Sequence, residues 1–355
     1  MPEPEVAPEV NTRTARTAGR VHSRQPRMED VARVAGVSHQ TVSRVLNNFP
    51  NVRASTRARV LAAIEELGYR RNTAARTLVT RRSGTIGVVT AEMNHFGPAS
   101  IMVGLESASR AAGYNLSLTG LSDISAAALR TAVDRVLDRA VEAVVILVAH
   151  EAALALAQSL QIGVPLVVVE GDLTATPLTA GVDQIAGARL AVNHLLDLGH
   201  HSVVHLPGPA EWLEAAARRE GWRMALKKRN APVPALMAEG DWTARSGYQA
   251  SRALLAQSRP TAIFAANDQM ALGLLRALHE AGLGVPEDVS VVGFDDVPES
   301  GYYTPPLTTV RQDFRELGER VMALVLRLLA GEAKASVPLV EPLLIVRSST
   351  AAPPT

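Results

Sequence analysis

The sequence predicts an α/β protein with a three-helix helix-turn-helix head over residues 28–71 and a body of two doubly wound α/β subdomains over residues 84–350. Two observations carry this prediction. The head holds three short segments with helical spacing of apolar residues, two of them followed by glycine. In the body, β-branched runs alternate with helical stretches, as in parallel sheets buried on both faces. A length of 355 residues allows several folding units.

The charge of the chain is unevenly distributed. The net charge is +1, but residues 1–82 hold 15 arginines, no lysine and 7 acidic residues, a balance of +8 that leaves −7 for residues 83–355. A basic segment of this kind indicates a polyanionic partner, because neutralising phosphates releases their counterions. A charge run alone is also typical of a solvated face, so the helix pattern must decide between the two.

The composition excludes several classes of protein. Residues 1–27 are polar and lack an apolar core segment, so we expect a disordered tail and no secretory signal; residues 351–355 form a second tail. The absence of cysteine excludes disulfides and thiolate metal sites. No apolar run approaches the roughly 20 residues of a membrane span. We therefore expect a cytoplasmic protein with no membrane role.

The first predicted helix covers about residues 28–35. Its apolar residues Val31, Val34 and Ala35 are spaced by three and four positions, which places them on one face. Gly36 follows where a left-handed residue commonly ends a helix.

The next two helices follow after short connections. Ser38 supplies a capping oxygen for the second helix, which runs to Leu46. The third lies in ASTRARVLAAIEELG and ends before Gly68. Its inward-facing residues are Val60, Ile64 and Leu67. Three such helices can share one small core.

The second helix has a polar face that its own core does not require. Val42, Val45 and Leu46 occupy the other face. In a helix-turn-helix motif the second helix enters the major groove of DNA. Arg44 can form two hydrogen bonds to guanine, Gln40 two to adenine, and His39 can donate or accept at a base edge. Residues better placed for phosphates are Thr41, Ser43 and Asn47.

The stretch from Met28 to Leu78 resembles, without gaps, the DNA-binding head of the LacI/GalR family of bacterial repressors. The resemblance implies that His39, Gln40 and Arg44 read bases. Further DNA contacts implied in the head are Ser38, Thr41, Ser43, Asn47, Thr56 and Tyr69.

The same resemblance implies a hinge helix at NTAARTLV within a hinge and linker segment, residues 72–83. Leu78 matches the leucine wedged between central base pairs, Ala75 is the small residue that allows close approach, and Asn72 begins the segment. Eight residues are too few for a stable isolated helix, so an ordinary linker is the alternative. The two interpretations are compatible if the segment is disordered in the free protein and folds into a helix only on DNA.

The predicted strands of the body are apolar runs separated by helical stretches. They are TIGVVT, YNLSLTG, AVVILVA, PLVVVE, SVVHLPG, TAIFAAN and VSVVGFDD. Their number suits two doubly wound subdomains, with a cleft where loops leave the carboxyl ends of the strands. Small molecules bind at such clefts.

The body resembles the core of the same family, which is similar to periplasmic sugar-binding proteins. The closest stretches are LPGP, RREGWRMAL, GDWTARSGYQ, ANDQMALG, VSVVGFDD and PPLTTVRQDF. The effector contacts that this resemblance implies are Arg218, Trp242, Asn267, Gln269, Asp295 and Phe314. Arginine, asparagine and aspartate suit vicinal hydroxyls, and an indole suits the C–H face of a sugar. The alternative for single residues is structural: Asp295 ends a strand, and either aromatic belongs to a core.

Several positions depart from the family pattern. Glu170 replaces an aspartate, Glu214 a small hydroxyl residue, Asp123 an arginine, and His95 an apolar residue near Pro98. Residues added to the ligand-binding prediction on this basis are His95, Pro98, Glu170 and Glu214. We expect a glycoside that need not be a galactoside.

Metal and enzyme signatures are weak. His194, His200, His201 and His205 cluster in the sequence but lack an i, i+4 pair with a carboxylate partner. No P-loop, G-x-G-x-x-G or G-x-S-x-G motif occurs. We therefore predict neither a metal, a cofactor nor an enzyme.

These observations and the resemblance together predict a homodimeric repressor that binds a pseudo-palindromic operator on double-stranded DNA and is released by a sugar or glycoside. One alternative keeps DNA binding but uses a corepressor such as a purine. The other is an extracytoplasmic sugar-binding protein, which leaves the arginine-rich head unexplained.

Overall fold

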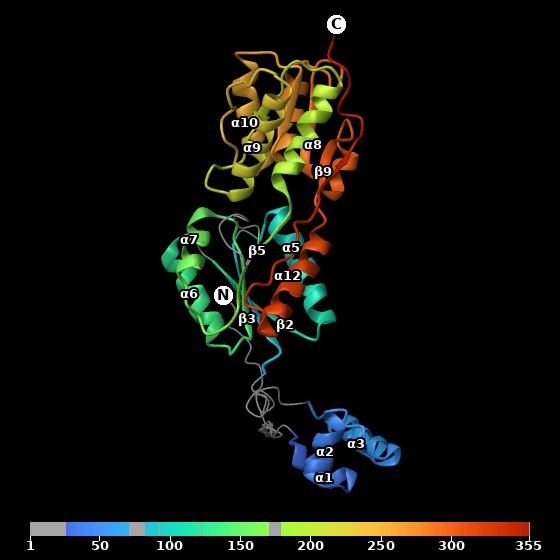
Figure 1. Cartoon of the computed structure of the whole chain (residues 1–355). Helices are drawn as coiled ribbons and strands as arrows, with labels where there is room; N and C mark the ends of the chain where they lie inside the picture. Colours follow the sequence, from blue (N-terminus) through green and yellow to red (C-terminus); the bar gives the residue numbers. More distant parts are fainter. Residues whose placement is uncertain (1–25, 71–81, 92, 122, 170–178, 355) are drawn as a thin grey trace, which may run out of the picture. The chain divides into compact units, whose positions relative to one another are not determined.

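The structure of the chain is a computed structural model that describes residues 26–70, 82–91, 93–121, 123–169 and 179–354. It divides between residues 79 and 80 into two compact units, which we call the head and the body (Figure 1).

The head consists of three helices around one small core. They are α1 (Met28–Ala35), α2 (His39–Leu46) and α3 (Ala54–Leu67). Fully buried Val31, Val42 and Val60 contribute one side chain from each helix to this core. The left-handed residues Gly36 (φ 62°) and Gly68 (φ 58°) follow α1 and α3. The predicted helices and their ends are therefore confirmed.

The prediction that Val34 lies in the head core was wrong. Val34 is 39% exposed, and Ala32 is buried in its place. The i, i+3, i+4 pattern assigned Val34 to the buried face, but the buried residues of α1 are Val31, Ala32 and Ala35. A valine at the edge of a short helix remains in solvent.

The body contains two sheets, each covered by helices on both faces (Figure 1). The first sheet has the order β2-β1-β3-β4-β5, and all of its pairings are parallel. Its strands are β1 (Thr85–Thr90), β2 (Asn115–Gly120), β3 (Ala143–Leu147), β4 (Leu166–Val169) and β5 (Thr179–Ala180). One face packs on α5 (Phe96–Ala111) and α12 (Phe314–Leu329), the other on α6 (Ala126–Leu137) and α7 (Glu151–Ser159). We call this unit the N-subdomain.

The second sheet has the order β10-β9-β8-β7-β6. Its strands are β6 (Val204–Leu206), β7 (Ala262–Ala265), β8 (Ser290–Asp295), β9 (Thr308–Arg311) and β10 (Leu343–Ile345). Helices α10 (Ala244–Leu255) and α11 (Asp268–Glu280) cover one face, and α8 (Gln184–Asp197) and α9 (Leu213–Lys228) cover the other. A short 3-10 helix, η1 (Pro298–Tyr302), follows β8. We call this unit the C-subdomain.

The chain passes between the subdomains three times, near residues 181–183, 312–313 and 340–342. The first and third crossings lie side by side, because Asp183 N donates to Val340 O (3.0 Å) and Val340 N donates to Gly181 O (2.9 Å). Helix α12 therefore returns to the N-subdomain late in the sequence. These crossings position the site described below.

The predicted α/β class and the two doubly wound subdomains are confirmed. The predicted strand list omitted β5, β9 and β10, and β10 pairs with β9 in the antiparallel sense. Strands β5 and β10 have only two and three residues, and β9 (TTVR) contains a single apolar residue, so none of the three was recognised as an apolar run. The strand predicted at SVVHLPG is also shorter, confined to Val204–Leu206.

Candidate functional site

Helix α2 presents polar side chains to solvent as predicted. His39, Gln40, Arg44 and Asn47 are exposed, while Val42 and Val45 are buried. Thr41 and Ser43 are half-buried. Ser38 caps the helix, since its Oγ accepts from Thr41 N at 3.2 Å. The helix therefore holds a polar edge rigidly on a small core.

The remaining predicted DNA contacts are less uniform. Thr56 is half-buried in the first turn of α3. Tyr69 is only 9% exposed and packs with the head core, which indicates a packing role for its ring. Asn72, Ala75 and Leu78 lie outside the described residues, as does the predicted hinge. All of these DNA contacts stay predictions.

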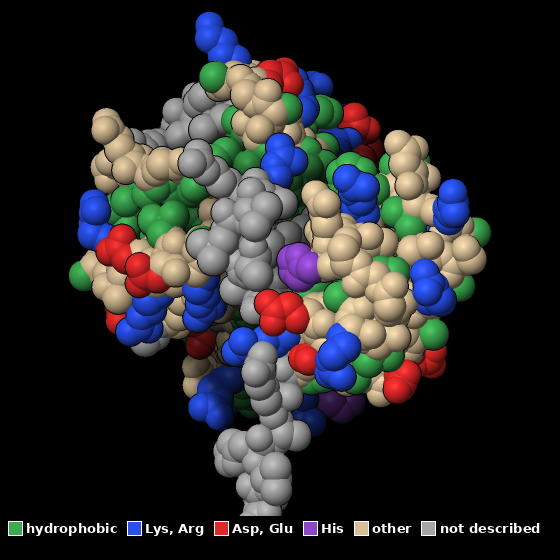
Figure 2. Space-filling view, turned by 90° about the horizontal axis from the view of Figure 1, so that it is seen from below, with side chains coloured by type: hydrophobic (Ala, Val, Ile, Leu, Met, Phe, Trp, Pro, Cys, Tyr) green, Lys and Arg blue, Asp and Glu red, His purple; other side chains and the backbone are tan. Residues whose placement is uncertain are grey.

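Basic side chains of the head lie in solvent. Exposed arginines in the described part of the head are Arg27, Arg33, Arg44, Arg53, Arg59 and Arg70. Blue Lys and Arg side chains are spread across the face of the molecule in Figure 2, among polar and hydrophobic side chains. Exposed guanidinium groups can pair with phosphates.

A cavity with about 650 Å³ of empty space, part of it open to solvent, lies between the two subdomains. It is lined by His95, Phe96, Gly97, Pro98, Ile101, Leu147, Ala149, Gln184, Trp212, Glu214, Arg218, Trp242, Asn267, Asp295, Gln312 and Phe314. Both subdomains and two of the crossings contribute. A polar side gives way to an apolar wall, which is the usual character of a small-molecule site.

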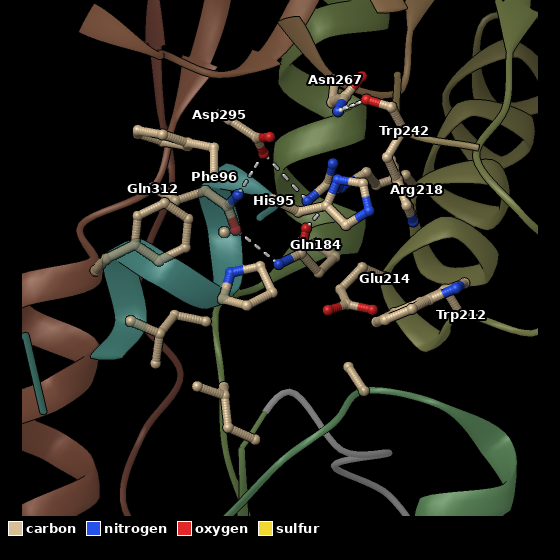
Figure 3. A pocket seen from close by; sticks show the side chains of 16 residues that line it. His95, Phe96, Gln184, Trp212, Glu214, Arg218, Trp242, Asn267, Asp295 and Gln312 are labelled. Carbon is tan, nitrogen blue, oxygen red and sulfur yellow. Dashed lines mark hydrogen bonds and ion pairs between the residues drawn. The ribbon is translucent and has the colours of Figure 1, made fainter. Parts of the chain in front are cut away.

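Four buried side chains form a closed hydrogen-bonded ring at the polar side (Figure 3). Arg218 Nε donates to Gln184 Oε1 (2.9 Å), and Gln184 Nε2 donates to Gln312 Oε1 (2.8 Å). Gln312 Nε2 donates to Asp295 Oδ1 (2.7 Å), which also lies 3.4 Å from Arg218 Nη2. Each member is less than 8% exposed. We call these residues the polar ring.

Burial dominates the electrostatics of this ring. It raises the pKa of Asp295 to about 6, although the adjacent Arg218 and the hydrogen bond from Gln312 act in the opposite direction. Burial, and then repulsion from Asp295, raise the pKa of Asp268 well above its ordinary value. Asp268 accepts from Thr309 Oγ1 (2.6 Å) and Val297 N (2.9 Å) beneath the site.

Trp242 lies against the guanidinium of Arg218, whose Cζ is 5.5 Å from the indole centroid. Its backbone is left-handed (φ 69°), and its carbonyl accepts from Asn267 Nδ2 (3.1 Å). A Cβ on Gly208 would lie 2.4 Å from the indole, so only glycine leaves room for the ring. Asp295 also has a positive φ of 106°. Backbone strain of this kind concentrates at ligand sites.

A further contact between the subdomains lies at the edge of the cavity around Trp212 (Figure 3). Leu213 N donates to Ala149 O (2.9 Å), and the indole of Trp212 meets His150 edge to face at 5.9 Å. A second backbone bond joins Glu151 N to Glu211 O (3.2 Å). The subdomains are therefore joined here as well as at the crossings.

The structure gathers most of the predicted ligand residues around this cavity. They are His95, Pro98, Glu214, Arg218, Trp242, Asn267, Asp295 and Phe314. Gln269 does not line it but accepts from Asn267 Nδ2 through Oε1 (3.0 Å). Asp123 is exposed and is not among the lining residues, and Glu170 lies outside the described residues. Phe314 also packs in the N-subdomain core, so its two interpretations are compatible.

Sequence reasoning missed Gln184, Gln312 and Trp212. All three lie in connections that leave strands β5, β9 and β6, and residues at carboxyl ends of parallel strands are the expected places for a ligand. For Trp212 that signal was available, since SVVHLPG was predicted as a strand. For the glutamines it was hidden, because β5 and β9 were not predicted.

The histidine cluster separates into structural roles. His200 contacts Thr261 Oγ1 and Ala351 O, both at 3.0 Å, and His194 Nε2 contacts Thr350 Oγ1 at 2.9 Å. His205 is fully buried. In the part of the chain that the structure describes, no group of three His, Asp or Glu residues is arranged to hold a metal ion. A search of the same part for a helix long and apolar enough to cross a membrane finds none.

Two family models match the chain. Residues 27–72 match the model described as bacterial regulatory proteins, lacI family, and residues 192–350 match the periplasmic binding protein-like domain. The first match covers the head and the second covers much of the body.

Curated relatives and solved structures extend over nearly the whole chain. The lactose operon repressor of Escherichia coli (strain K12) is 38% identical over 92% of this chain and 91% of that protein. The regulator CelR of Thermobifida fusca is 37% identical over 92% of this chain and 98% of that protein. A lac repressor dimer bound to operator and an anti-inducer is similar, with a TM-score of 0.85 at 37% identity, covering 93% of this chain and 100% of that one. A structure of the CelR–cellobiose complex is similar with a TM-score of 0.68 at 32% identity, and the match covers 91% of this chain and 99% of that one.

Proposed function

This chain belongs to the LacI family of bacterial regulatory proteins, and from that premise we propose that it is a transcriptional repressor released from its operator by a small sugar or glycoside. The observation that carries this proposal is the coexistence, in one chain, of an exposed polar edge on α2 and a cavity with a buried Arg218–Asp295 pair. The first feature suits DNA, the second polyhydroxylated ligands.

The repressor acts as a homodimer on a pseudo-palindromic operator, because two-fold symmetry in the protein imposes two-fold symmetry on the DNA it reads. A relative of this chain has been solved as a dimer on its operator. We place the protein in the cytoplasm, where bacterial DNA lies.

The cavity serves binding and not catalysis in this proposal. The Arg218–Asp295 pair would instead accept and donate hydrogen bonds to vicinal hydroxyls, with Trp242 against a ring face.

The test begins with selection of duplexes from a random pool at moderate ionic strength, followed by operator titrations with cellobiose, lactose and ribose. These sugars follow the names of relatives of the chain. We expect selection of a palindrome and release by at least one saccharide. Selection of no palindrome over random duplex contradicts the proposal. Tightening by a purine or other base supports corepression instead.

A further inference from the structure

We infer that Gln184 and Gln312 are positioning residues that transmit occupancy of the sugar cavity to the crossings between the subdomains. This inference rests on the proposed function and concerns the regulation of the same site. Neither glutamine was predicted from the sequence as a ligand residue. Their place in the polar ring assigns them this role.

The two ends of the ring belong to different parts of the fold. Arg218 lies in α9, and Asp295 ends β8, so both are anchored in the C-subdomain. Gln184 opens α8 directly after the first crossing, and Gln312 lies in the second crossing between β9 and α12. The ring therefore joins the charged pair in the cavity to two of the three covalent connections.

Each glutamine lies beside an aspartate that fixes the start of a helix. Asp183 Oδ1 accepts from Ala186 N (2.8 Å) at the start of α8, and Asp313 Oδ1 accepts from Glu316 N (2.8 Å) at the start of α12. Helix α8 packs in the C-subdomain, whereas α12 packs in the N-subdomain. A shift of Gln184 thus acts on the start of α8 in the C-subdomain. A shift of Gln312 acts on the start of α12 in the N-subdomain.

The hydrogen bonds of the ring are directional, so the position of each member depends on its neighbours in the ring. Each glutamine uses its carbonyl oxygen to accept and its amide nitrogen to donate within the ring. A sugar hydroxyl that takes the Asp295 or Arg218 end changes the partners of at least one glutamine. Buried networks of this kind have few alternative arrangements, which is the property a two-state connection needs.

The experiment compares Gln184→Met and Gln312→Met with the parent chain. Methionine keeps the length of the side chain and removes both hydrogen-bonding groups. For each protein, operator Kd is measured with and without saturating sugar, with cellobiose, lactose and ribose as probes, and sugar Kd is measured separately by calorimetry. The parent is expected to show a ratio of operator Kd values within the usual range of roughly 5–150-fold.

We expect both variants to bind operator, and to bind sugar with a measurable but weakened affinity, because each loses a hydrogen bond that positions Arg218 or Asp295. Their operator Kd ratio, however, should fall toward 1. Ser251→Ala is the control: Ser251 is fully buried, and its Oγ donates to Gly247 O (2.6 Å) outside the ring. That variant should lower the melting temperature and leave the ratio unchanged.

Two outcomes overturn the inference. If sugar saturates the glutamine variants and still releases operator with the parent ratio, the ring does not transmit occupancy. If the variants no longer bind sugar at all, the glutamines are ligand contacts and not positioning residues. A parent chain that ignores every probe contradicts the proposed function itself, and with it the premise of the inference, before any variant is compared.

Discussion

At the scale of single residues, base reading depends on side chains that α2 holds in solvent. Arg44 is exposed, and its neighbour Val45 is buried, so the guanidinium can reach outward without disturbing the head core. Arg44→Ala is expected to cost about 1–3 kcal/mol at one operator position and to relax base preference there. Competition binding against a set of single-base operator variants measures this. Equal losses on every sequence would make Arg44 a phosphate contact.

Asp295 gives sugar binding a pH dependence. Its pKa of about 6 lies above the ordinary 3.8, so its contribution to stability is present below pH 3.8 and lost as pH rises through about 6. Sugar affinity changes with pH in the opposite direction, because the ionised carboxylate is the better acceptor for hydroxyls. We expect sugar affinity to fall as pH drops from 7 to 5 in calorimetric titrations. Asp295→Asn should remove this dependence; a flat parent profile would contradict the assignment.

His205 makes stability itself depend on pH. Burial lowers its pKa from 6.5 to about 3, and the ring is held neutral between Phe264, at 4.7 Å, and Trp222. Because the unfolded chain takes up this proton first, stability is complete above pH 6.5 and is lost toward pH 3. The slope is about 1.4 kcal/mol per pH unit. Urea unfolding of the parent and of His205→Phe between pH 4 and 7 measures it, and equal slopes would exclude His205 as the source.

At the scale of elements, α5 and α12 cross through a backbone contact. A Cβ on Gly318 would lie 2.2 Å from the carbonyl carbon of Gly104, so neither helix can carry a side chain there. Gly318→Ala is expected to destabilise the body by about 1–3 kcal/mol, the usual effect of overpacking. Thermal unfolding measures this, with Gly163→Ala as the control because no atom lies within 4 Å of its added Cβ. Equal melting temperatures for the two variants would contradict this packing argument.

How much could be predicted from the sequence differed from one element to another. The three helices of the head and seven of the body's strands were predicted from local patterns, since capping and apolar runs are encoded within one segment. The strand β9 and the crossings were not, because they are short and their hydrogen-bond partners lie far away in the sequence. Gln184 and Gln312 were missed for this reason: they are separated by 128 residues and meet only in the folded body.

At the scale of the whole molecule, the chain has a basic N-terminal part, which includes the head, and an acidic remainder, which includes nearly all of the body. Residues 1–82 carry +8 and residues 83–355 carry −7. The body therefore contributes repulsion and not attraction toward DNA phosphates, so that specific binding must come from the head. An effector that binds only the body can then control DNA binding only through a conformational equilibrium that both units share.

Such an equilibrium couples the affinity for sugar and the affinity for operator reciprocally. If a sugar weakens operator binding by a given factor, the operator must weaken sugar binding by the same factor. We expect sugar Kd, measured by calorimetry with and without saturating operator, to rise by the factor found in the operator titrations. Asn267→Ala serves as the control: loss of its hydrogen bond to the carbonyl of Trp242 should weaken sugar binding while the head remains unchanged. Unequal factors in the parent would mean that the sugar acts through a second site or a change in oligomeric state, and not through the cavity between the subdomains alone.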